Sequence, residues 1–69
     1  MSDSVYKIIE LVGSSDVSWD DAAKVAIEKA SKSLKDLRIA EVIQQDIKME
    51  NGNIAAYRIK MKVSFKYLD

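Results

Sequence analysis

The 69-residue chain contains no cysteine, no histidine and no proline, and it has only two glycines. Without cysteine it can form no disulfide, and without cysteine or histidine it lacks the ligands of the common zinc sites. The same absences exclude Ser-His-Asp and Cys-His nucleophiles, as well as an imidazole that titrates near neutral pH. Gly13 and Gly52 lie too far apart to build a phosphate-binding loop or a dinucleotide fingerprint. We therefore predict that the protein is not an enzyme.

Charge and hydropathy argue against two further classes of protein. The chain has 11 basic and 11 acidic residues, and this balance is not typical of a general nucleic-acid binder. No apolar run approaches the roughly 20 residues that a membrane-spanning helix needs. The sequence thus predicts a cytoplasmic protein whose partners include neither nucleic acid nor a membrane.

The small size of the chain predicts self-association. A domain of this length buries only roughly 60% of its unfolded surface, and such a core rarely supplies more than about 3 to 5 kcal/mol. Because disulfides and zinc are excluded as supplements, contacts with other copies are the supplement that remains. We expect residues 1–69 to form one domain that is stable as a homo-oligomer.

Residues in the first half of the chain predict a strand followed by a helix. The segment 5–12 is rich in β-branched and aromatic residues and ends at Gly13, which indicates a strand that leads into a loop. From Trp19 to about Lys35, apolar residues recur every three or four positions, and Ser18 is a suitable N-cap. This half therefore predicts a strand, a loop and one amphipathic helix.

The second half alternates with a period of two. Strands are predicted over Ile39–Met49 and Ile54–Tyr67, and Asn51-Gly52 is a strong hairpin signal between them. A right-handed crossover through the helix places the first strand beside the third. We predict an α+β fold of β-α-β-β order, with an antiparallel three-stranded sheet and the helix on one face.

The length of the third strand supports the predicted oligomer. About 14 residues at roughly 3.4 Å each reach some 48 Å, whereas a compact globule of this size is about 28 Å across. A single helix of about 26 Å cannot cover so long a strand. The uncovered end, which includes Phe65 and Tyr67, is expected to be buried by other subunits.

A two-residue turn at Asn51-Gly52 also predicts the register of the hairpin. The expected cross-strand pairs are Gln45 with Arg58, Ile43 with Lys60, Glu41 with Lys62, and Ile39 with Ser64. All of them lie on the face away from the helix, together with Ile47. Three isoleucines among charged residues are unusual on a face exposed to water, so we expect a ligand or another subunit to cover it.

Three segments carry a resemblance to a known family. SVYKIIELVGSSDVSWDDAAKVAIEKAS, RIAEVIQQDIKM and YRIKMKVSFKY resemble the dodecins, small β-α-β-β proteins that assemble into a hollow homododecamer and in many members bind flavin. The resemblance runs from about Val5 to Tyr67. It implies a non-enzymatic binding or storage protein for a small ligand, with other copies of the chain as its partners.

The resemblance also implies which residues contact the ligand. Flavin-binding dodecins stack a tryptophan on the ring where this chain has Ile39, and they present a glutamine where it has Arg58. Isoleucine cannot stack on a flat ring, and arginine donates hydrogen bonds but cannot accept them. The chain is therefore nearer to the branch without the stacking tryptophan, and weak binding of FMN or riboflavin is expected. The candidate ligand-binding residues are Ile39, Glu41, Gln45 and Arg58.

Other features leave alternatives open. Asp16, Asp20 and Asp21 could supply oxygen ligands to calcium, or they could act as acids in the first turn of the helix. An ion-binding assembly without an organic ligand is accordingly an alternative function, although we assign no metal ligands. Trp19 could be a displaced stacking platform, or it could pack against the preceding loop or another subunit.

Charged strand residues have two interpretations as well. A basic stripe on the third strand could bind phosphates or could form a solvated or cross-paired face; it consists of Arg58, Lys60, Lys62 and Lys66. Glu10 and Glu41 are the strand carboxylates that could act as acid or base, but ion pairing is the expected role.

Overall fold

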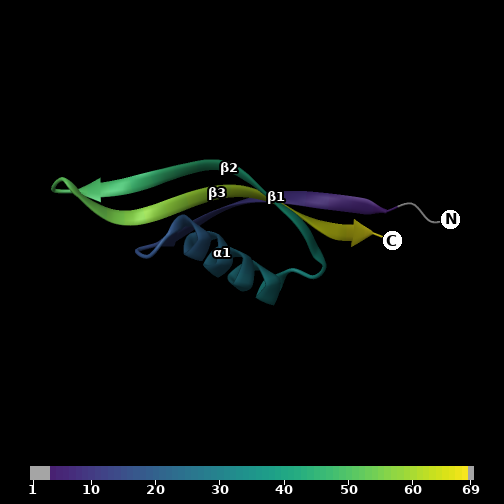
Figure 1. The fold of residues 1–69 in the computed structure, drawn as a ribbon. Coiled ribbons are helices and arrows are strands. Elements are labelled where there is room, and N and C mark those ends of the chain that lie inside the picture. Colours follow the sequence, from purple (N-terminus) through teal and green to yellow (C-terminus); the bar gives the residue numbers. More distant parts are fainter. Residues whose placement is uncertain (1–3, 69) are drawn as a thin grey trace.

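A computed structural model describes residues 4–68, which form three strands and one helix. The elements are β1 (Val5–Ser15), α1 (Trp19–Ser33), β2 (Leu37–Glu50) and β3 (Asn53–Leu68). The sheet has the order β1-β3-β2, and both neighbours pair with β3 in antiparallel orientation. The helix lies on one face of this sheet (Figure 1). The predicted element order, the central third strand and the one-sided helix are confirmed.

β1 continues through Gly13 to Ser15, so the predicted end of the first strand is wrong. Gly13 is buried beneath the helix, and a Cβ atom at this position would collide with the carbonyl oxygen of Ala22 and lie 3.0 Å from the Cβ of Ala26. The glycine thus serves the close approach of the helix to the strand, not the formation of a loop.

The start of α1 is fixed by hydrogen bonds from its own sequence and from β1. Ser18 is the N-cap, and its hydroxyl accepts a hydrogen bond from the backbone N–H of Asp21 at 3.0 Å. The carboxylate of Asp21 accepts a hydrogen bond from the Ser15 hydroxyl at 2.6 Å, which ties the first turn to the end of β1. The helix ends at Ser33, two residues before the predicted Lys35, because Leu34 is already extended.

The core is small and lies between α1 and β3. In the described part of the chain, the buried apolar residues are Ala22, Ile59, Met61 and Val63. Ile9 and Leu11 of β1 and Ile27 of the helix are among the partly buried residues that pack against them. So few buried side chains agree with the expectation that one subunit has too little core to be stable alone.

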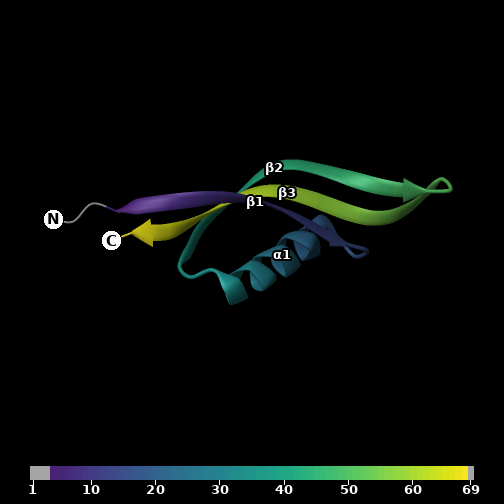
Figure 2. The same cartoon turned by 180° about the vertical axis from the view of Figure 1, so that it is seen from behind.

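The molecule is elongated because the strands are longer than the helix and extend beyond it. Its extents are 56 × 20 × 14 Å, and its radius of gyration of 14.4 Å exceeds the roughly 11 Å of a compact chain of this length. The β2–β3 hairpin projects beyond the helix, while the described ends of the chain lie at the opposite end (Figures 1 and 2). Apolar side chains are exposed at both ends, with Met49 62%, Ile54 53% and Tyr67 57% accessible. Phe65 is half-buried.

Between residues 4 and 68, the structure contains no helix that is both long and apolar enough to cross a membrane.

Candidate functional site

The register of the β2–β3 hairpin shifts at three places, one of them between Leu37 and Ile39 at the start of β2. The other two decide which side chains reach the outer face of the sheet, the face away from the helix. Near the turn, the register shifts between Lys48 and Met49, so that Ala55 is skipped in β3. A second shift skips Ile43 in β2 and restores the original register. The stretch between these two bulges is therefore displaced by one residue from the register that the turn alone predicts.

The predicted pairs beyond the second bulge are confirmed, and those between the bulges are wrong. Glu41 pairs with Lys62 and Ile39 pairs with Ser64, as expected. Arg58, however, pairs with Asp46 and not with Gln45. Lys60 pairs with Gln44, and Ile43 has no partner in the ladder.

A displacement of one residue exchanges the two faces of a strand. Gln45 and Ile47 pair with Ile59 and Tyr57, which share the helix-side face with the core, so our placement of Gln45 and Ile47 on the outer face is wrong. Gln44 and Asp46 take their place on the outer face. The polar run Gln44-Gln45-Asp46 breaks strict alternation, and this break is the signal by which the sequence could have revealed the displacement.

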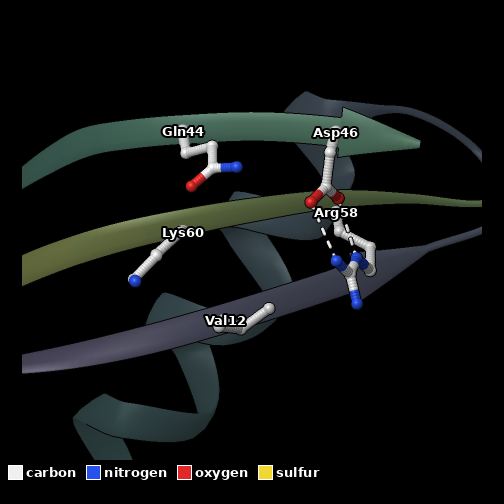
Figure 3. A pocket seen from close by; sticks show the side chains of 5 residues that line it. All are labelled: Val12, Gln44, Asp46, Arg58 and Lys60. Carbon is white, nitrogen blue, oxygen red and sulfur yellow. Dashed lines mark hydrogen bonds and ion pairs between the residues drawn. The ribbon is translucent and has the colours of Figure 1, made fainter. Parts of the chain in front are cut away.

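The outer face contains a hollow of about 260 Å³, which we call the strand-face pocket. Its lining comes from all three strands, as Figure 3 shows: Val12 from β1, Gln44 and Asp46 from β2, and Arg58 and Lys60 from β3. Of the candidate residues predicted from sequence, only Arg58 lines this pocket.

Arg58 and Asp46 form a bidentate ion pair at one side of the pocket. The Nε and Nη2 groups of Arg58 donate hydrogen bonds of 2.7 and 2.8 Å to the two carboxylate oxygens of Asp46. The hydrogen bonds and the positive charge of Arg58 lower the pKa of Asp46, and the same contact raises the pKa of Arg58. Both groups therefore stay ionised over the ordinary pH range.

The second cation of the pocket is also matched by an acid. The ammonium group of Lys60 lies 3.5 Å from a carboxylate oxygen of Glu10 on β1. The side-chain amide of Gln44, in contrast, has no hydrogen-bond partner within residues 4–68. The strand-face pocket thus offers one free amide, an apolar contact at Val12 and two cations whose charge is already balanced.

Ile39 lies in a different hollow. This second hollow, of about 400 Å³, is lined by Tyr6, Arg38, Ile39 and Ser64. The side chain of Ile39 is 68% exposed there. Glu41 lies opposite Lys62 on the same outer face and lines neither hollow. The structure thus separates the two positions, Ile39 and Arg58, that the family resemblance implies for one ligand.

Trp19 packs inside the subunit. Its indole N–H donates a hydrogen bond of 3.0 Å to the backbone carbonyl of Asp46, and its ring meets Tyr57 edge-on at 5.3 Å. The tryptophan therefore links the start of α1 to β2 and holds the backbone of a residue that lines the strand-face pocket. This arrangement gives Trp19 a structural role in the subunit.

The acidic residues at the start of the helix do not gather into a metal site in one subunit. The Asp21 carboxylate is engaged with Ser15. Among residues 4–68, no group of three or more acidic side chains is close enough together to hold a metal ion.

Comparisons with known proteins agree with one another. The sequence model of the family described as Dodecin matches residues 5–68. A calcium dodecin from Mycobacterium tuberculosis is 46% identical over 63 residues, which are 91% of this chain and 89% of that protein.

Solved structures give the same result. A dodecin from Streptomyces davaonensis superposes with a TM-score of 0.92 at 31% identity, covering 99% of this chain and 100% of that one. The crystal structure of the calcium dodecin from Mycobacterium tuberculosis, described as having a novel calcium-binding site, superposes with a TM-score of 0.85 at 48% identity. The match covers 93% of this chain and 91% of that one. With its whole β-α-β-β region matched in sequence and in structure, the chain belongs to the dodecin family.

Proposed function

We propose that residues 1–69 form a single dodecin-like domain and that twelve copies assemble into a hollow shell that binds a small organic ligand without catalysing a reaction. The observation that carries the proposal is the strand-face pocket, in which three strands surround a free amide on Gln44. The exposed apolar ends of the long strands support the assembly, because Met49, Ile54 and Tyr67 would be covered by neighbouring subunits.

The proposed ligand contacts modify the set predicted from sequence. Arg58 and Ile39 remain candidates because each lines a hollow on the outer face. Gln44 takes the role that we expected of Gln45, since its amide can both donate and accept hydrogen bonds at that face. Glu41 lies between the two hollows along β2 and is a candidate for a ligand that extends from one to the other.

Native mass spectrometry of protein purified directly from cells tests both parts of the proposal. The expected result is a twelve-subunit particle that retains an organic molecule. Sedimentation of a stable folded monomer at micromolar concentration would contradict the assembly. A dodecamer that retains no organic molecule, and binds none from a metabolite extract, would contradict the ligand.

A calcium-binding shell is the second candidate function. It is favoured by the 46% identity to a protein named calcium dodecin. Because no acidic cluster of sufficient size lies in one subunit between residues 4 and 68, calcium would be held by carboxylates from more than one copy of the chain. Elemental analysis of the purified assembly and calorimetric titration with Ca²⁺ test this function, and an absence of calcium in both would contradict it.

A further inference from the structure

The outer face of β3 carries the four cations of the basic stripe, and three of them, Arg58, Lys60 and Lys62, lie opposite or beside a carboxylate from a neighbouring strand. Arg58 is paired with Asp46, and Lys60 is paired with Glu10. Lys62 lies opposite both Glu10 and Glu41 in the strand register. These three cations of the basic stripe, which could have bound phosphates, are therefore balanced by acids contributed by β1 and β2.

The carboxylate of Asp46 accepts the same hydrogen bonds from the Arg58 guanidinium that an anionic ligand would accept. The two N–H···O bonds of 2.7 and 2.8 Å form the parallel fork by which a guanidinium binds a carboxylate or a phosphate. A phosphorylated ligand that enters the strand-face pocket would have to displace Asp46 before it could bind Arg58 in this way. It would also bring its negative charge close to the carboxylate that it displaced.

Asp46 is well placed to hold this position. Its backbone carbonyl accepts the hydrogen bond from Trp19, and its carboxylate points across the strand toward Arg58 in Figure 3. Uncharged ligands do not compete with the pair, and the free amide of Gln44 and the apolar side chain of Val12 remain available to them.

We propose that Asp46 determines the specificity of the strand-face pocket: by holding Arg58, it makes the pocket select uncharged ligands over their phosphorylated forms. This inference rests on the proposed binding function and names the chemical class of the ligand. Asp46 acts through Arg58 and lies on the pocket wall, so its removal changes the preference for charge while leaving the apolar contacts in place.

Riboflavin and FMN are suitable probes because they differ by one phosphate group. Fluorescence titrations of both compounds are carried out with the wild-type assembly, with Asp46→Asn and with the double variant Asp46→Asn, Arg58→Gln. Asn is the same size as Asp and leaves the backbone carbonyl that accepts from Trp19. Glu50→Gln is the matched control. The Glu50 carboxylate forms another exposed ion pair, 3.9 Å from the ammonium group of Lys48, and Glu50 does not line the pocket.

The expected result is a gain of at least about tenfold in the affinity of Asp46→Asn for FMN, because a freed guanidinium gains charge-assisted hydrogen bonds to the phosphate. The affinity for riboflavin should change by less than about threefold. The gain for FMN should disappear in the double variant and be absent from Glu50→Gln.

An affinity for FMN that is the same in Asp46→Asn and the wild type, including no measurable binding by either, would overturn the inference. So would a gain that persists without Arg58, because the phosphate would then be bound elsewhere. Failure of the proposed function is recognised separately, by the absence of an organic ligand in the native mass spectrum. The gain at Asp46→Asn does not depend on that result, since it requires only that Arg58 face the pocket.

Discussion

Gly13 on β1 lies directly against the backbone carbonyl of Ala22 on α1, with no space for a Cβ atom between them. Helix and strand can approach so closely only because one of the two residues lacks a side chain. The contact fixes the height of the helix above the sheet at the position where the small core begins, since Ala22 is itself fully buried.

Replacing Gly13 with Ala should lower the free energy of unfolding by about 1 to 3 kcal/mol, because the added methyl group meets backbone and not a flexible side chain. Denaturant titration at a fixed protein concentration measures the effect, since an oligomer's stability depends on concentration. Ser14→Ala, at the exposed neighbouring position in the same strand, is the control and should be nearly neutral. A stable Gly13→Ala variant would show that the helix can move away at little cost.

The Asp46–Arg58 pair predicts a pH dependence of stability. The hydrogen bonds from Arg58 lower the pKa of Asp46 in the folded state. The stabilisation from the pair is therefore fully present above the pKa that Asp46 has in the unfolded chain, and it is lost as the pH falls through the pKa of Asp46 in the folded protein. The difference in thermal midpoint between wild type and Asp46→Asn should therefore be constant near neutral pH and shrink below about pH 4. In an Arg58→Gln background, this pH-dependent difference should largely vanish. A difference that stays constant down to pH 2 would contradict the assignment.

Substitutions at Gly52 in the hairpin turn should lower stability through backbone strain alone. Asn51 and Gly52 have positive φ angles of 52° and 79°, and nothing lies within 4 Å of a Cβ built on Gly52. Gly52→Ala should cost about 1 to 2 kcal/mol, since an L-residue resists the left-handed region. Gly52→Val should cost more because its β-branch restricts the backbone further. Equal stability of all three proteins would mean that the turn changes its conformation freely.

The helix and strands were predicted well because the spacing of apolar residues along the sequence follows directly from the backbone geometry of each element. Side chains alternate along Ile59, Met61 and Val63, so the strand and its buried face follow from the pattern. Asn51-Gly52 predicted the turn because positive φ angles favour such residues, and both residues have positive φ angles in the structure. The central place of β3, which we predicted from a crossover through the helix, is confirmed by the strand order β1-β3-β2.

The site was predicted only in part because register is sensitive to single residues. The bulges at Ala55 and Ile43 cancel each other, so the pairing of Glu41 with Lys62 was predicted correctly although Gln45 was placed on the wrong face. Nothing in the identity of Ala55 distinguishes a bulged residue from a paired one. The Arg58–Asp46 pair was missed for the same reason, since it exists only in the displaced stretch.

A charge introduced near the end of β3 should disrupt the proposed assembly. Phe65 is half-buried in the described chain, and in the proposed dodecamer its remaining surface is covered by another subunit. Phe65→Asp should dissociate the particle and unfold the chain, because an unpaired buried charge costs several kcal/mol. Analytical ultracentrifugation with circular dichroism records both effects. Lys29→Asp on the exposed surface of the helix is the control and should leave the particle intact; an intact dodecamer of Phe65→Asp would contradict the proposed interface.

Binding of riboflavin is expected to depend on Ile39 and Arg58 together. Ile39 is 68% exposed in its hollow, so a tryptophan at this position has room to present its ring. Stacking on a flat ring contributes about 1 kcal/mol beyond area burial, which corresponds to roughly fivefold in affinity. Arg58→Gln replaces a group that only donates hydrogen bonds with an amide that also accepts them. The variant Ile39→Trp, Arg58→Gln should therefore bind riboflavin at least about fivefold more tightly than the wild type in a fluorescence titration.

Val17→Trp is the matched control, because Val17 is also 68% exposed but lies in the loop between β1 and α1 and lines neither hollow. It should not change the affinity for riboflavin. Tight quenching by the wild type would show that a residue other than Ile39 provides the stacking surface. Absence of a gain in the double variant would show that the displacement of Gln44 and Asp46 onto the outer face has altered the pocket too far for two substitutions to restore flavin binding. The wild type would then be expected to retain an uncharged molecule of a different shape, which the native mass spectrum identifies.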